Sequence, residues 1–344
     1  MIFPPFLSES GKIGVTAPSC GVTDPTDKAR FANARRRLAE RGHDVMETSD
    51  VYTADGDGRS APAEQRVREL RSLLDDDGVE YIVSAKGGDY QIEMLPLMDW
   101  EHLREHPKWM QGYSDNTVLL FKATAEHDVA TIYGGNFGDY GMEPWHRSVS
   151  ENLEIVEGKR REQDSFPFHE EGFADRATGL EGIREEAVTV WTSPDGDVSF
   201  EGRLIGGCMD VLEWFHRVGE ADPSPFVSRY KNEGIVWYME TYDMDEARVS
   251  AMLEGMARDG WFEGASGFVF GRPLFFRGAD YVSTVCDALS GFGVPKVFGA
   301  DVGHKAPRMT FVNGARARFE VSGGGCRLAY LEELRPYVSN QGKY

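Results

Sequence analysis

Residues 108–120 read KWMQGYSDNTVLL, in which a short apolar strand runs into Gly-Tyr-Ser-Asp and a helix-like run follows at once. A serine on such a sharp strand-to-helix turn projects its hydroxyl into solvent, and the free N–H groups of a helix N-terminus favour developing negative charge. The stretch therefore predicts that Ser114 is a nucleophile for acyl transfer. Ser-Asp is also an ordinary helix N-cap, and on these residues alone that alternative stays open.

The residues before Ser114 alternate between strand and helix patterns. Strands are expected at 12–18, 45–48 and 81–85, with helices over 25–41 and 62–74. This rhythm predicts a parallel sheet covered by helices on both faces, whose functional residues lie at the carboxyl ends of strands. The Gly87-Gly88 loop and Ser114 both follow such ends.

A polar, irregular stretch divides this α/β part from a second part that is richer in strands. We predict an N-terminal α/β domain over residues 1–150, a linker over 151–185 and a C-terminal mixed domain over 186–344. The second domain is expected to have a sheet or barrel-like core. Its patterns indicate strands at 235–239, 267–270 and 296–299 and a hairpin around Asn313-Gly314.

Composition excludes several classes of protein. The 344 residues carry a net charge of −20, whereas binding to nucleic acid or to an anionic membrane requires clustered positive charge. No run approaches the roughly 18 apolar residues that a membrane span needs, and the first residues do not resemble a signal peptide. The four cysteines are widely spaced, which favours reduced thiols. We therefore expect a cytoplasmic protein.

A nucleophilic serine needs a base, and the base needs a carboxylate to orient it. His304 lies in a glycine-containing loop after a strand, and Glu240 ends the strand at 235–239. The order Ser114, Glu240, His304 matches one known order of triad residues. Taken singly, His304 could instead bond to loop backbone, and Glu240 could be a solvated strand end.

Six short segments together resemble the LD-carboxypeptidases, serine peptidases that include muropeptide LD-carboxypeptidase and the microcin C immunity peptidases. The segments occur in family order and span nearly the whole chain: Ala17-Pro18-Ser19, Lys86-Gly87-Gly88, Gly112-Tyr113-Ser114-Asp115, residues 202–207, Tyr238-Met239-Glu240-Thr241 and residues 301–307. The resemblance implies Ser114 as nucleophile, His304 as general base and Glu240 as the orienting carboxylate. It places the nucleophile in one domain and its two partners in the other.

The same resemblance implies further roles. It puts an oxyanion hole at the backbone amides of Gly88 and Asp115 and substrate contacts at Lys86 and Gly87. Lys86 stands where the family has arginine, so an ammonium replaces a two-point guanidinium contact. Cys208 stands where the family usually has asparagine. No metal or organic cofactor is implied, and a homodimer is expected.

The substrate remains open between two classes. Trp191 falls roughly where microcin-type members place a tryptophan that stacks on adenine, although a strand tryptophan is commonly part of the core. Together with the chain length, this favours a peptidyl- or aminoacyl-sulfamoyl-adenosine substrate. The alternative is a muropeptide LD-carboxypeptidase that releases terminal D-alanine during murein recycling.

Two rival interpretations lie outside this family. His102-Leu103-Arg104-Glu105-His106 matches H-x-x-E-H, the pattern of one class of zinc peptidase. Pro107 follows immediately and the surroundings are charged, which disfavours a metal site. The other rival is a ligand-binding protein that kept the fold and lost the chemistry; an intact Ser114, Glu240 and His304 set argues against it.

Overall fold

The first of the two large sheets is built mainly from the N-terminal third of the chain. The computed structural model describes residues 1–173, 176–332 and 334. Six strands form this sheet: β1 Lys12–Thr16, β2 Val45–Glu47, β3 Val79–Ser84, β4 Trp109–Gly112, β5 Thr131–Tyr133 and β13 Phe311–Asn313. Their order is β13-β5-β4-β3-β1-β2. All neighbours are parallel except β13, which runs antiparallel to β5.

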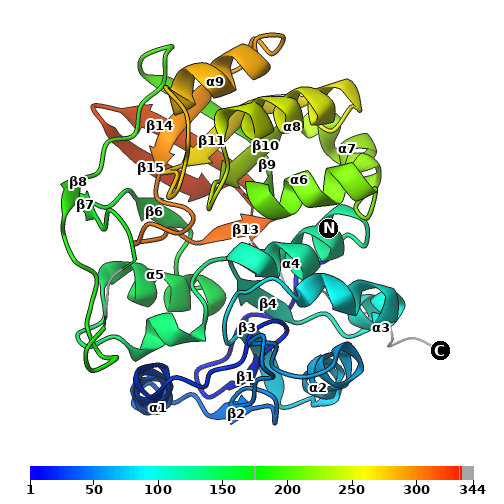
Figure 1. Ribbon diagram of the computed structural model, residues 1–344, viewed down its shortest axis with the longest axis vertical. Helices are drawn as coiled ribbons and strands as arrows, with labels where there is room; N and C mark the ends of the chain where they lie inside the picture. Colours follow the sequence, from blue (N-terminus) through cyan, green and yellow to red (C-terminus); the bar gives the residue numbers. More distant parts are fainter. Residues whose placement is uncertain (174–175, 333, 335–344) are drawn as a thin grey trace.

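Helices and short 3₁₀ turns connect these strands. The helices are α1 Pro25–Ala39, α2 Ala63–Asp75, α3 Trp100–Glu105, α4 Thr117–Ala125 and α5 Arg147–Val156, and the 3₁₀ turns are Gln91–Leu97, Ser114–Asn116 and Phe137–Gly141. Helix α1 starts where it does because the Asp24 carboxylate accepts from the first-turn N–H groups and Pro25 occupies the first position. Helix α4, buried along nearly its whole length, lies between the two halves of the molecule (Figure 1).

The second sheet is mixed and belongs mostly to the C-terminal half. Its strands are β6 Glu162–Asp164, β9 Val198–Cys208, β10 Ile235–Glu240, β11 Ala265–Gly271, β12 Lys296–Ala300, β14 Arg316–Ser322 and β15 Gly325–Tyr330. The order is β12-β11-β10-β9-β14-β15-β6, parallel from β12 to β9 and antiparallel beyond. Four helices accompany it: α6 Met209–Val218, α7 Ser224–Tyr230, α8 Glu246–Arg258 and α9 Tyr281–Ala288. A separate two-stranded ribbon pairs β7 Phe168–His169 with β8 Ala187–Val188.

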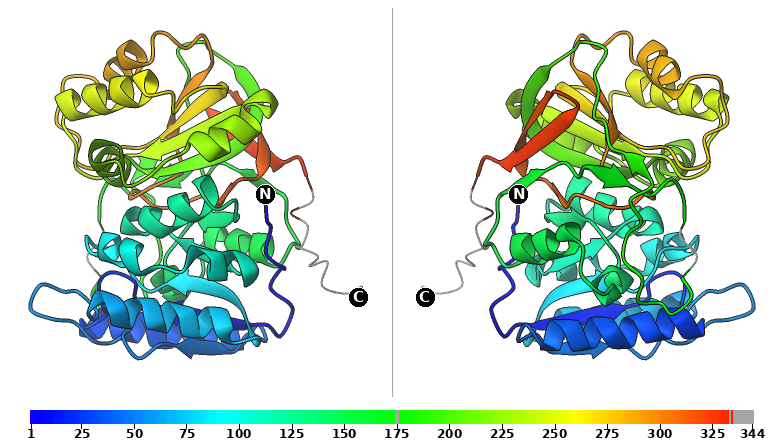
Figure 2. Two further views of the ribbon diagram at one scale, coloured as in Figure 1. Left: turned by 90° about the vertical axis from the view of Figure 1, so that its right-hand side faces the viewer. Right: turned by 90° about the vertical axis from the view of Figure 1, so that its left-hand side faces the viewer.

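The predicted fold class is confirmed: a parallel-sheet α/β part carries the serine, and a mixed, strand-rich part follows. Figure 2 shows the two parts stacked, with the first helices, drawn in blue, at the end of the molecule away from the second sheet. Of the two alternatives for the second part, the structure has the sheet, which is open with β12 and β6 at its edges in the described residues. No helix among these residues is long and apolar enough to cross a membrane.

Two local expectations were wrong. The segment 151–185 is not uniformly irregular, because it includes most of α5 and also β6, which pairs with β15. The hairpin around Asn313-Gly314 is absent: β13 pairs with β5 in the first sheet, whereas β14 pairs with β9 and β15 in the second. Gly314, with φ of 84°, lies where the chain passes from one sheet to the other. The domain boundaries at 150 and 185 stay a prediction.

Candidate active site

Ser114 occupies a strained turn directly after β4. Its φ is 66°, in the left-handed region that side chains other than glycine rarely adopt. Its backbone N–H donates to the Tyr133 hydroxyl at 3.0 Å. Gly87 packs against it so closely that a Cβ at that position would lie 3.3 Å from Ser114 Oγ. The sharp strand-to-helix turn expected from the sequence is therefore present.

A continuous chain of hydrogen bonds runs from Ser114 through His304 to Glu240. His304 Nε2 lies 3.0 Å from Ser114 Oγ, and His304 Nδ1 lies 2.8 Å from Glu240 Oε2. Because an ionised carboxylate only accepts, Nδ1–H donates to Glu240 and Nε2 is left to accept from the serine hydroxyl. Ser114 follows a strand of the first sheet, while Glu240 ends β10 and His304 follows β12 in the second. The carboxyl ends of parallel strands from both sheets thus meet at one place.

The loop that carries His304 is shaped by glycine and held by Arg308. Gly303 has φ of 105°, and a Cβ there would come within 2.6 Å of the Glu240 side chain, so only glycine lets the loop approach this closely. Arg308 donates to the carbonyls of Gly303 and His304, and its guanidinium lies 4.1 Å from the centre of the Tyr113 ring. Arg308 was not among the residues predicted from the sequence, although it directly follows the segment 301–307 that resembles the family.

Glu240 is fully buried, yet it remains ionised. Burial by itself would raise its pKa; the positive charge that His304 carries when it is protonated and the hydrogen bonds from His304 and Tyr133 outweigh burial and lower the pKa below its usual value. Its second oxygen, Oε1, accepts from the Tyr133 hydroxyl at 2.7 Å. The site therefore holds a permanent negative charge behind the imidazole.

The Asp115 side chain ties the Ser114 turn to the neighbouring loop. Its carboxylate accepts from Ser19 Oγ at 2.5 Å and from the backbone N–H groups of Tyr90 and Gln91 at 3.1 and 2.9 Å. Burial raises the pKa of Asp115 to about 6 despite these donors. Gly88, with φ of 150°, has no room for a side chain because a Cβ would lie 2.5 Å from Cys20 Sγ.

Two cavities flank the Ser114–His304 pair. One of about 280 Å³ is lined by Ser114, Gly88 and Asp115, with Cys208, Asp210 and Trp214 on its other wall. The second, of about 330 Å³, is lined by His304 together with Lys86, Phe173 and Arg308. The predicted oxyanion-hole residues Gly88 and Asp115 thus lie beside Ser114, and His304 faces a separate space.

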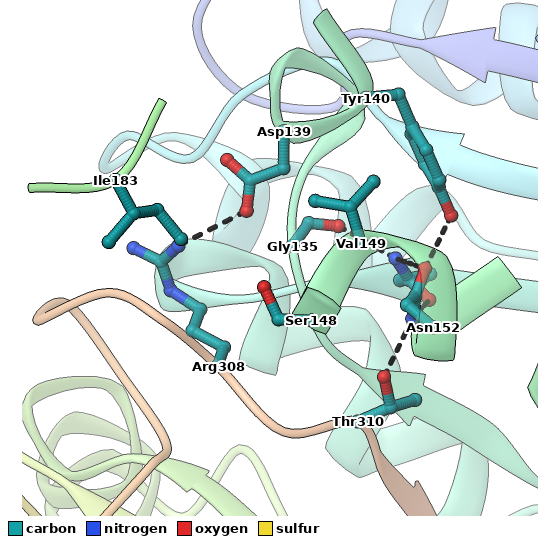
Figure 3. A pocket seen from close by; sticks show the side chains of 10 residues that line it. Gly135, Asp139, Tyr140, Ser148, Val149, Asn152, Ile183, Arg308 and Thr310 are labelled. Atoms are coloured by element: carbon teal, nitrogen blue, oxygen red, sulfur yellow. Dashed lines mark hydrogen bonds and ion pairs between the residues drawn. The ribbon is translucent and has the colours of Figure 1, made fainter. Parts of the chain in front are cut away.

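Arg308 reaches the second cavity from a buried polar network. Its guanidinium pairs with Asp139 at 3.1 Å, and a water-sized space of about 20 Å³ lies beside this pair (Figure 3). On the far wall of that space, Asn152 donates to Thr310 Oγ1 at 2.9 Å. The network fixes the segment that follows His304.

Trp191 does not lie at either cavity. Its side chain is 1% exposed, and its indole N–H donates to Asp301 Oδ2 at 3.0 Å, while Asp301 also pairs with Arg272 at 2.7 Å. A ring buried in this way has no free face for a nucleobase. The structure therefore does not support the predicted stacking role, and Trp191 is part of the core instead.

Exposed aromatic side chains surround His304 instead. Tyr242 and Phe173 have ring centres 4.8 and 6.2 Å from the imidazole, and Phe275 contacts both at 5.5 and 6.4 Å. Phe173 is 55% exposed. They come from three separate loops, so no local sequence pattern indicated them.

Lys86, a predicted substrate contact, lines the second cavity. Its side chain is about half exposed and pairs with Asp27 at 2.8 Å.

The two histidines of the H-x-x-E-H segment lie close together. His102, in α3, lies 2.7 Å from Asp75, and its ring centre is 4.2 Å from that of His106. The described residues contain no group of three or more His, Cys, Asp or Glu side chains that could hold a metal ion.

Hydrolases use a hydroxyl, an imidazole and a buried carboxylate in series for acyl transfer. The same arrangement lies here at the junction of the two α/β parts. The chain matches the LD-carboxypeptidase N-terminal domain over residues 13–134 and the LD-carboxypeptidase C-terminal domain over residues 201–319. It belongs to the LD-carboxypeptidase family and is a peptidase.

Relatives and solved structures agree with this assignment. A carboxypeptidase-named protein of Treponema pallidum is 33% identical over 92% of this chain and 91% of its own. The microcin C7 self-immunity protein MccF of Escherichia coli is 23% identical, covering 90% of each chain. The structure of MccF in complex with aspartyl sulfamoyl adenosine has a TM-score of 0.78 at 20% identity, covering 97% of this chain and 100% of that one. The muramoyltetrapeptide carboxypeptidase from Oxalobacter formigenes has a TM-score of 0.71 at 20% identity, covering 93% and 99%.

Proposed function

We propose that this chain is a serine carboxypeptidase in which Ser114 is the nucleophile, His304 the general base and Glu240 the carboxylate that orients the base. The observation that carries the proposal is the unbroken hydrogen-bond chain from Ser114 Oγ through both imidazole nitrogens to Glu240. An ordinary N-cap serine would not need an imidazole partner with a buried carboxylate behind it.

The chemistry follows from these contacts. Ser114 Oγ attacks the scissile carbonyl carbon while its proton passes to His304 Nε2, and Glu240 stabilises the imidazolium. The oxyanion is bound by the backbone N–H groups of Gly88 and Asp115, which border the cavity beside Ser114. The imidazolium then protonates the leaving amine, and a water molecule activated by His304 releases the acyl group from Ser114.

The two cavities indicate where each part of the substrate would lie. The leaving amine must reach His304 and therefore extends into the larger cavity, whereas the acyl group stays beside Ser114 in the smaller one. The larger cavity is lined by four cationic side chains, Arg30, Lys86, Arg176 and Arg308, and by three carboxylates, Asp27, Asp139 and Glu170. The excess of cations suits the terminal carboxylate of a departing amino acid. This charge is what a carboxypeptidase needs on its leaving-group side.

Within this function, we propose that an amide between an acidic amino acid and sulfamoyl adenosine is preferred to a murein tetrapeptide. Phe173 supports the proposal, since it lies at the larger cavity and is exposed enough to stack on a base. The muropeptide alternative is supported by the cations of the same cavity, which suit a terminal D-alanine.

A side-by-side measurement of kcat/KM for both substrates tests this choice. Base–aromatic stacking is worth about 1–3 kcal/mol, so Phe173→Ala should lower use of the adenosine substrate by about 5- to 150-fold. The tetrapeptide, which has no planar base, should change by less than about threefold on the same scale. Phe168→Ala is the matched control, because Phe168 is 38% exposed and outside both cavities. Preference for the tetrapeptide, with Phe173→Ala silent on both substrates, would establish the muropeptide alternative.

Activity should fall on acidification, because only a neutral imidazole accepts the serine proton. The value of kcat/KM should therefore decline as His304 becomes protonated. Asp115, whose pKa burial raises to about 6, is a second group that gains a proton as the pH falls. We expect Asp115→Asn to retain the acid limb of the pH profile. A wild-type rate that stays flat from about pH 8 to about pH 4.5 would remove His304 from the base role.

We further propose that the protein is a cytoplasmic homodimer. The compartment is supported by the four cysteines, all of which are free thiols. The dimer rests on resemblance to the family alone, and sedimentation of the purified protein tests it.

A further inference from the structure

Tyr133 contacts both ends of the proposed catalytic chain, Ser114 and Glu240. It is the last residue of β5 and is 1% exposed. Its hydroxyl accepts from the Ser114 backbone N–H at 3.0 Å and donates to Glu240 Oε1 at 2.7 Å. A single oxygen atom therefore joins the nucleophile's backbone to the carboxylate that orients the base.

The contact with Ser114 acts on the strained part of the turn. A residue held at φ of 66° needs surrounding contacts that keep it there. The bond to Tyr133 holds the Ser114 N–H on the side of β5. This N–H is therefore engaged within the protein, which leaves the oxyanion to the amides of Gly88 and Asp115.

The contact with Glu240 satisfies an oxygen that His304 does not reach. Glu240 is 0% exposed, and a buried carboxylate oxygen without a donor is costly. Burial and the nearby Glu240 charge raise the pKa of Tyr133 well above its ordinary value, so the phenol keeps its proton and stays a donor. Tyr133 thus fixes the rotation of the carboxylate that faces the imidazole.

We infer that Tyr133 is a positioning residue of the proposed reaction, whose hydroxyl sets the placement of Ser114 relative to the Glu240–His304 pair. The inference rests on the proposed role of Ser114 as nucleophile. Tyr133 borders neither cavity, so it acts on the reacting groups and not on substrate binding. Its loss should therefore change kcat and leave KM alone.

Tyr133→Phe tests this by removing one oxygen atom. We expect kcat to fall about 10- to 100-fold, the effect of losing a hydrogen bond to a charged group, with KM within about twofold of wild type. Tyr238→Phe is the matched control. Tyr238 is equally buried, its ring centre lies 5.5 Å from that of Tyr133, and its hydroxyl donates to Asn313 Oδ1 at 2.7 Å, away from Ser114 and His304. The control should keep kcat within about threefold.

A second variant keeps the test decisive if Tyr133→Phe folds poorly. Replacing Tyr133 with p-aminophenylalanine retains a donor at nearly the same place and should restore kcat to within about tenfold of wild type. The low-field proton resonance of His304 Nδ1–H should shift in Tyr133→Phe and stay unchanged in Tyr238→Phe. The inference is overturned if folded Tyr133→Phe keeps wild-type kcat, if both phenylalanine variants lose kcat equally, or if the amino variant folds but is not rescued.

Failure of this inference and failure of the proposed function give different results. If Ser114→Ala retains turnover, the serine mechanism itself is wrong. If Ser114→Ala is inactive while Tyr133→Phe is fully active, the mechanism stands and only the role of Tyr133 is lost.

Discussion

Ser114→Ala is expected to lower kcat/KM by about 10⁴- to 10⁶-fold, since members of a catalytic triad act as a unit and the loss of the nucleophile removes the covalent route. His304→Ala should cost a similar amount, because Nε2 is the hydrogen-bond partner of Ser114 Oγ and, among the residues that the structure describes, no other group is placed to take its proton. The measurement is steady-state hydrolysis of the preferred substrate. Labelling by a fluorophosphonate probe should disappear in parallel with turnover.

Controls of the same chemical kind separate catalysis from folding. Ser250→Ala removes a partly exposed hydroxyl that donates to Glu254 in α8, and His216→Ala removes an imidazole paired with Asp259. Both should stay within about twofold of wild type, as surface changes usually do. Circular dichroism and thermal melting must show all four variants folded. Near-normal hydrolysis by a folded Ser114→Ala protein would rule out the serine mechanism.

Glu240→Gln should lower kcat by about 10³- to 10⁴-fold, close to the effect known for the corresponding change in a serine-protease triad. Glu240 now accepts from two donors, His304 Nδ1–H on one oxygen and the Tyr133 hydroxyl on the other. Glutamine offers one oxygen and one NH₂ group, so one of these donors meets another donor. The imidazolium also loses the buried charge that stabilises it.

The measurement is kcat and KM together, with fluorophosphonate labelling of Ser114 as a second readout. KM should change little, because Glu240 borders neither cavity. Glu213→Gln is the control, since Glu213 pairs with Arg248 at 2.8 Å outside both cavities and should be nearly silent. A Glu240→Gln enzyme within tenfold of wild-type kcat would show that the carboxylate does not orient the base.

The prediction from sequence succeeded where the signal is local. The strands that end before the Gly87-Gly88 loop and before Ser114 are set by short apolar runs with turn residues after them, and β3 and β4 lie there. Glu240 ends β10, and Ser114 and His304 lie in the loops that follow β4 and β12. In each parallel sheet such positions gather at one edge, so the pattern carried spatial information within a sheet. That the two edges meet was decided by the tertiary structure.

It failed where a residue's role depends on distant partners. Trp191 has the same local pattern whether its ring is free or buried, and only its contact with Asp301 decides between the two. Asn313-Gly314 is a strong hairpin signal, yet β13 pairs with β5 because Asn313 meets Thr131 and Tyr238 between the sheets. A turn motif specifies a reversal of the chain and does not specify which strand will be the neighbour.

By itself, the sequence determined which groups are present and the strand ends on which they lie, because hydrophobic periodicity and turn chemistry act over a few residues. Only the tertiary structure decided which side chains meet. Tyr133 and Glu240 are 107 positions apart, and Ser114 and His304 are 190 apart. No pattern within one strand predicts that Tyr133 of the first sheet donates a hydrogen bond to Glu240 of the second. That contact exists only once both sheets have packed around α4.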